Sequence, residues 1–78
     1  MEENMPRQYS LVRTTEDIKE WLIKKGHSDS PILQEDTFIY LGEIPNMIGH
    51  CVLAGHKTGR ILSGYHTEDF EEIPEDET

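Results

Sequence analysis

The sequence predicts an α+β fold: one helix packed on a small three- or four-stranded antiparallel sheet, in the order (β)-α-β-β-β, with a disordered acidic C-terminal tail. Three observations lead to this prediction. One segment has helical periodicity and capping signals, short stretches are rich in aromatic and β-branched residues, and residues 49–66 read as a hairpin. A chain of 78 residues holds at most one domain. We expect a disordered N-terminus (1–7), a single domain (8–70) and an acidic tail (71–78).

The helix is expected at about residues 15–25, within the stretch TTEDIKEWLIKKG. Thr14 is the candidate N-cap, and Asp17 follows three residues later in a variant of the capping box. Acids occupy the first turn and lysines the last, as the helix dipole favours, and Gly26 supplies a left-handed stop. The stripe expected to face the core comprises Ile18, Trp21, Leu22 and the stem of Lys25.

Strands are expected on both sides of this helix. Residues 8–13 (QYSLVR) show weak alternation, and residues 37–44 (TFIYLGEI) are rich in aromatic and β-branched types. The hairpin follows a loop with turn-forming residues at 45–49 (PNMIG). These elements give the predicted chain order.

The hairpin register is predicted from Gly59, which suits the left-handed position of a G1 bulge in the turn HKTGR. The expected facing pairs are then His56 with Arg60, Ala54 with Leu62, Val52 with Gly64, and His50 with His66. The last pair would have Cβ atoms roughly 4.5–5.5 Å apart on one sheet face. The opposite face would carry Cys51, Leu53, Ile61, Ser63 and Tyr65.

A metal site is not expected from the histidines. A structural zinc site needs four ligands, and His50 and His66 supply two. Cys51 points through the other face, and His56 is roughly 20 Å away at the usual strand rise. Completing the site would require outside ligands such as Glu68, Asp69 or His27. We therefore expect no metal and no other cofactor.

Catalytic motifs are also weak. Cys51 is a lone strand cysteine, which is typical of a small core residue, and Ser63 lacks a nucleophile-elbow pattern. The stretch GHKTG lacks the full spacing of a phosphate-binding loop. The acids Asp69 and Glu71 fall in a polar segment with no expected pocket. We therefore expect a protein that is not an enzyme.

Charge is distributed unevenly along the chain. The net charge is −9, and residues 68–78 contain seven acids and no base. Such a segment repels nucleic acid and membrane surfaces and suits a basic protein patch. With no apolar run of membrane-spanning length, no secretory signal and a single cysteine, we expect a cytoplasmic location.

The leading functional hypothesis is a small interaction or regulatory protein that binds another protein, through its acidic C-terminal region among other surfaces. The candidate protein-binding residues are Met47, Ile48, His50, Tyr65, His66, Phe70, Glu71 and Glu72. One alternative is an acidic nucleic-acid mimic, an inhibitor of the phage type. A further alternative is a metal-dependent protein that uses His50 and His66. Direct nucleic-acid binding is not expected, because the bases form no cluster beyond Lys24 and Lys25. The oligomeric state is left open.

Overall fold

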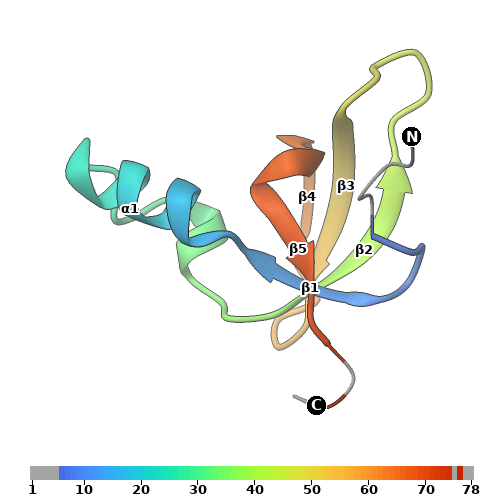
Figure 1. The fold of residues 1–78 in the computed structure, drawn as a ribbon, viewed down its shortest axis with the longest axis horizontal. Coiled ribbons are helices and arrows are strands. Elements are labelled where there is room, and N and C mark those ends of the chain that lie inside the picture. Colours follow the sequence, from blue (N-terminus) through green and yellow to red (C-terminus); the bar gives the residue numbers. More distant parts are fainter. Residues whose placement is uncertain (1–5, 75, 77–78) are drawn as a thin grey trace.

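A computed structural model describes residues 6–74 and 76, and it shows one helix beside a strongly bent antiparallel sheet of five strands (Figure 1). The elements in chain order are β1 (Leu11–Thr14), α1 (Glu16–Lys24), η1 (Pro31–Leu33), β2 (Phe38–Glu43), β3 (His50–Gly55), β4 (Ile61–His66), η2 (Thr67–Asp69) and β5 (Phe70–Glu72). The α+β class is confirmed. The expected three or four strands are not, because the sheet has five, in the spatial order β4-β3-β2-β1-β5.

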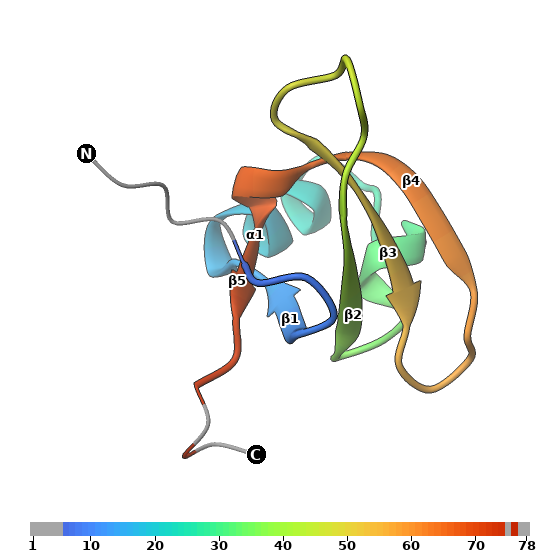
Figure 2. The same cartoon turned by 90° about the vertical axis from the view of Figure 1, so that its right-hand side faces the viewer.

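The additional strand, β5, lies in the segment expected to begin the acidic tail. It pairs antiparallel with β1, and Figure 2 shows the two strands side by side. Arg13 faces Glu71, and their Nε and Oε2 atoms are 2.9 Å apart. The Ile73 amide donates to the Leu11 carbonyl at 2.9 Å. A disordered tail from residue 71 is therefore not confirmed; residues 75, 77 and 78 lie outside the described part.

The N-terminal segment is likewise ordered where it is described. Residues 1–5 of the expected disordered stretch 1–7 lie outside the described residues. Pro6 is buried, and the Arg7 side chain donates to Glu72. This contact fastens the start of the described chain to β5.

Helix α1 begins one residue later than the capping signal suggested. The N-cap is Thr15, whose Oγ1 accepts from the Ile18 amide at 3.4 Å, whereas Thr14 is the last residue of β1. The choice of Thr14 is therefore wrong, because β1 extends to that residue. At the other end Gly26 has φ +83°, and the predicted left-handed stop is confirmed.

The buried face of α1 is narrower than expected. Leu22 is buried and Ile18 packs against the core, but Trp21 is 51% exposed. The predicted burial of Trp21 is wrong. The helix projects from the side of the sheet (Figure 1), so only one edge of its apolar stripe finds a partner. Trp21 instead lies beside His27, with ring centroids 6.2 Å apart. No helix in the described ranges has the length and apolar character needed to cross a membrane.

The β3–β4 hairpin has the predicted pairing at its open end and a different one near the turn. His50 faces His66 as expected, and Gly59 has φ +76°. Near the turn, however, Gly55 rather than His56 pairs with Arg60, and the Gly55 amide donates to the Arg60 carbonyl at 2.8 Å. The turn therefore uses one residue more than predicted.

A bulge at Gly64 restores the register farther out. Ala54 faces Ile61 and Val52 faces Ser63, while Cys51 faces Tyr65, so Gly64 is the extra residue in β4. Its φ of +86° is a conformation that favours glycine. The predicted pairs Ala54–Leu62 and Val52–Gly64 are consequently wrong.

The one-residue change in register also means that the β4 residues lie on other faces of the sheet than predicted. Leu62 is buried and faces Leu53, whereas Ile61 is 61% exposed. Ile61 and Ser63 thus lie with Ala54 and Val52 on the outer face. The expected alternation was continuous through β4, and a bulge interrupts such alternation by one residue.

The core lies against the bent sheet, with Leu22 of α1 and Ile32 of η1 packed into it. Phe38 and Phe70 meet edge to face, with ring centroids 5.8 Å apart and planes at 82°, and so join β2 to β5. The buried apolar residues are Val12, Leu22, Ile32, Phe38, Tyr40, Cys51, Leu53, Leu62 and Phe70. Every strand contributes, as do α1 and η1, so Phe70 of β5 belongs to the same core as the hairpin residues.

Candidate functional site

An open groove of about 960 Å³ lies between the β2–β3 loop (residues 44–49) and the η2–β5 segment (residues 67–72). We call it the acidic groove. It is lined by Thr15, Glu43, Ile48, Gly49, His50, His66, Thr67, Glu68, Phe70, Glu71 and Glu72. Six of the eight candidate binding residues line this groove: Ile48, His50, His66, Phe70, Glu71 and Glu72. The structure thus brings together residues from the loop, the hairpin end and β5.

One wall of the acidic groove is a loop held in place by its own backbone. The loop rises beyond the ends of β2 and β3 (Figure 2). The Ile44 amide donates to the His50 carbonyl at 2.9 Å, and the His50 amide donates to the Met47 carbonyl at 3.0 Å. Glu43 accepts from the Gly49 amide at 3.1 Å. These bonds hold Ile48 91% exposed, beside a half-exposed Met47.

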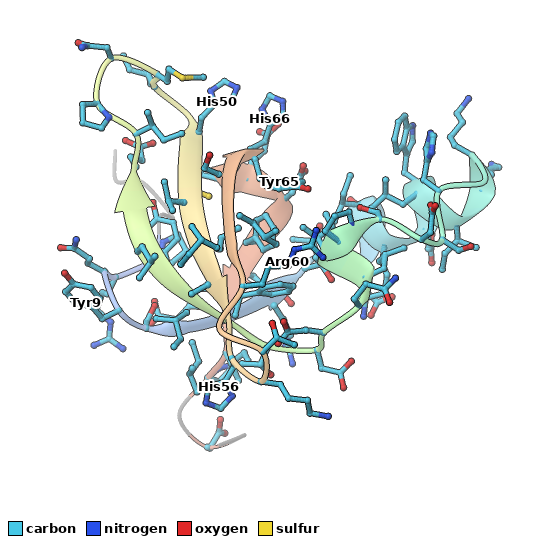
Figure 3. The ribbon with its side chains drawn as sticks, turned by 180° about the vertical axis from the view of Figure 1, so that it is seen from behind. Tyr9, His50, His56, Arg60, Tyr65 and His66 are labelled. Atoms are coloured by element: carbon cyan, nitrogen blue, oxygen red, sulfur yellow. The ribbon has the colours of Figure 1, made fainter. Side chains whose placement is uncertain are left out.

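The two histidines meet at the end of the β3–β4 hairpin. Their ring centroids are 4.6 Å apart, and Figure 3 shows both rings at the same end of the sheet. His56 lies at the opposite end, as predicted. The His50 Nδ1 atom is 3.3 Å from the Ile48 carbonyl oxygen, which links the ring to the loop.

The histidine pair does not extend to a metal site within the described residues. No group of three or more His, Cys, Asp or Glu side chains in this part of the chain is arranged to hold an ion. Cys51, which directly follows His50, is fully buried. Burial raises the pKa of its thiol, which favours the protonated form.

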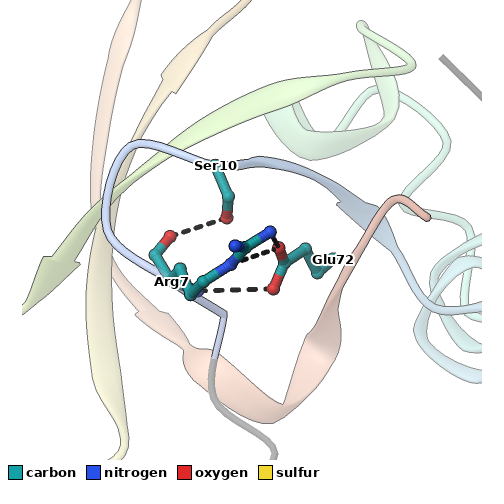
Figure 4. A network of polar contacts seen from close by, with 3 residues as sticks. All are labelled: Arg7, Ser10 and Glu72. Atoms are coloured by element: carbon teal, nitrogen blue, oxygen red, sulfur yellow. Dashed lines mark hydrogen bonds and ion pairs between the residues drawn. The ribbon is translucent and has the colours of Figure 1, made fainter. Parts of the chain in front are cut away.

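Four glutamates and no lysine or arginine line the acidic groove. Two of the four glutamates, Glu71 and Glu72, form ion pairs with arginines. Glu71 contacts Arg13 across the sheet, and Glu72 accepts from the Arg7 guanidinium at 2.6 Å (Figure 4). This hydrogen bond lowers the pKa of Glu72. Glu43 and Glu68 have no Lys or Arg partner in the described part of the chain.

A half-buried aspartate, Asp69, lies between Glu68 and Glu71 in the chain. Asp69 is in η2, and its carbonyl accepts from the Thr15 amide at 2.9 Å, which ties η2 to the start of α1. Burial raises the pKa of the Asp69 carboxyl, and nearby His66 lowers it by a smaller amount. The histidine pair therefore has a carboxyl neighbour on its own side of the groove.

Thr67 lines the acidic groove, and its hydroxyl is buried, as is that of Tyr40 in the core. Thr67 donates its amide to the Gly49 carbonyl at 2.8 Å, so η2 and the loop are directly connected. The Thr67 hydroxyl and the buried Tyr40 hydroxyl form no well-formed hydrogen bond in the described residues. They are close enough for Thr67 to offset part of the rise in the pKa of Tyr40 that burial causes.

Two of the candidate residues lie outside the acidic groove. Tyr65 is half-buried and packs edge to face on Phe70 at 6.4 Å, beneath the groove wall. Met47 is on the loop but does not line the groove. Sequence reasoning missed Thr15, Glu43, Gly49, Thr67 and Glu68 as lining residues. Of these five, only Glu43 and Glu68 could have been noticed in the sequence, through their charge. No local sequence pattern shows that the β2–β3 loop faces η2.

Comparison with protein-family models, with curated proteins and with solved structures finds no match for this chain. The functional argument therefore rests on the chemistry of the acidic groove.

Proposed function

We propose that this protein is a small non-enzymatic module that binds another protein through the acidic groove. The observation that carries the proposal is Ile48, which is 91% exposed on a loop held by internal hydrogen bonds. The side chain is large, apolar and exposed to water on an ordered loop. The free energy of the system falls when a partner covers it. Full burial of such a side chain contributes about 1.5–3 kcal/mol.

The surroundings of Ile48 support a protein partner. Protein interfaces combine an apolar centre with a polar rim. Here Ile48 stands beside the His50–His66 pair, and Glu43, Glu68, Glu71 and Glu72 line the same groove. A partner with a basic surface would complement these carboxylates, which agrees with the acidity of the C-terminal region.

Site-specific photo-crosslinking tests this proposal. A photoreactive amino acid at position 48, expressed in the native host, should give one discrete adduct with another protein. The matched control is position 61, because Ile61 is also an exposed isoleucine but does not line the acidic groove. Absence of an adduct at position 48, or equal adducts at both positions, would contradict the proposal.

A further inference from the structure

We infer that the partner contributes an extended segment that places a lysine or arginine beside Glu43 and Glu68 and an aliphatic side chain on Ile48, and that protonation of His50 and His66 releases it. This inference rests on the proposed function and specifies the chemistry of the ligand and the condition that releases it. The carrying observation is that the histidine pair lies in the same groove as the two carboxylates that have no basic partner among the described residues.

The charge of the acidic groove selects a cation. Glu71 and Glu72 are already paired with Arg13 and Arg7, so they contribute little net attraction. Glu43 comes from the end of β2 and Glu68 from η2, and neither has a Lys or Arg partner in the described part. A lysine or arginine from a partner is the complementary group.

The shape of the acidic groove favours an extended segment. It is partly open and is lined by residues of the β2–β3 loop and of β5. Its apolar surface comes from Ile48 at the rim and Phe70 at the base, and Phe70 is only 3% exposed. A partner side chain can therefore cover Ile48 but gains little from Phe70. An aliphatic residue next to the cation fits this arrangement.

The histidine pair makes the groove charge dependent on pH. Histidine changes charge between about pH 5 and pH 8. The titratable groups around the pair are Glu43 from β2, Tyr65 from β4, Glu68 and Asp69 from η2, and Glu71 and Glu72 from β5. The two rings, 4.6 Å apart, place any positive charge that they acquire in the same groove as the two carboxylates without basic partners. A bound cation opposes protonation of the rings, so acidification weakens binding.

Panning a random twelve-residue peptide library on the wild-type protein at about pH 7.5 identifies the ligand class. Enriched peptides should carry Lys or Arg adjacent to Leu, Ile, Val or Met. The binding constant of one enriched synthetic peptide should weaken roughly tenfold at about pH 5.5, as expected for one charge pair at short range in a partly solvated site. In the His50→Gln/His66→Gln variant most of that pH dependence should disappear.

Matched variants separate the groove from the general charge of the protein. Glu68→Gln and Ile48→Ser should each weaken the peptide at least about threefold, whereas Glu20→Gln and Ile61→Ser should not. Circular dichroism checks that each variant is folded, and wild-type binding should also weaken as salt rises. Enrichment of acidic or purely apolar peptides, or pH-independent wild-type binding, would overturn the inference. The proposed function would still stand if residue 48 formed its adduct, so the two failures are distinguishable.

Discussion

Replacing Phe70 with alanine tests whether the short strand β5 is part of the core. Phe70 is 3% exposed and packs edge to face on Phe38 at 5.8 Å and on Tyr65 at 6.4 Å. Truncation of a buried phenylalanine costs about 3–5 kcal/mol, and each ring pair accounts for about 0.5–1.5 kcal/mol beyond area burial. A domain of this size has roughly 4–12 kcal/mol of stability in total. Phe70→Ala should therefore remove a large part of the free energy of unfolding.

Urea denaturation followed by far-ultraviolet circular dichroism measures this loss. Phe70→Leu keeps most of the volume and should cost less than about 1.5 kcal/mol, which gives a folded variant if Phe70→Ala is too unstable. The control is Trp21→Ala, which removes a larger but 51% exposed ring and should cost less than about 1 kcal/mol. A larger loss for Trp21→Ala than for Phe70→Ala would refute the assignment of the core.

Three further predictions concern single contacts. Gly64→Ala should cost about 1–2 kcal/mol in urea denaturation, because φ is +86° at the bulge; Ser63→Ala, next to it, should be nearly neutral. Gly55→Ala should lower the melting temperature, because the new methyl would overlap the Glu35 carboxylate, and a Glu35→Ala background should remove this effect. The lowered pKa of Glu72 contributes stability that is present above pH 4.5 and lost as the pH falls below it. In acid titrations Glu72→Gln should therefore be less sensitive than wild type, and an unchanged curve would show that the Arg7 contact contributes nothing.

The helix and the hairpin end could be predicted because their signals are local. Acids in the first turn, lysines at the end and Gly26 bound α1 to within a residue or two. The pairing of His50 with His66 was also correct, although the other three predicted pairs were not. A turn one residue longer and a bulge at Gly64 shift the register in opposite directions, so they cancel at the histidines.

The missing strand shows what local patterns cannot provide. Residues 70–72 read as an acidic terminus because Glu71 and Glu72 dominate the composition. In the structure these carboxylates contact Arg13 and Arg7, which are far away in the sequence. Burial of Phe70 stabilises the segment. Neither this burial nor the two ion pairs can be recognised from the neighbouring residues in the sequence. The acidic groove depends on the same strand, so only its individual residues, and not their arrangement, could be anticipated.

The pairing of β1 with β5 also affects how the chain folds as it is synthesised. Arg13 and Glu71 are separated by 58 residues. At a translation rate of about 5–20 residues per second, roughly 3–12 s pass between the emergence of β1 and that of its outer neighbour. The β2–β3–β4 meander can form in this interval, because its contacts are local. Until residues 70–72 emerge, one edge of β1 and the Phe70 site in the core remain open, so the nascent protein passes through a stage in which its apolar interior is accessible to chaperones.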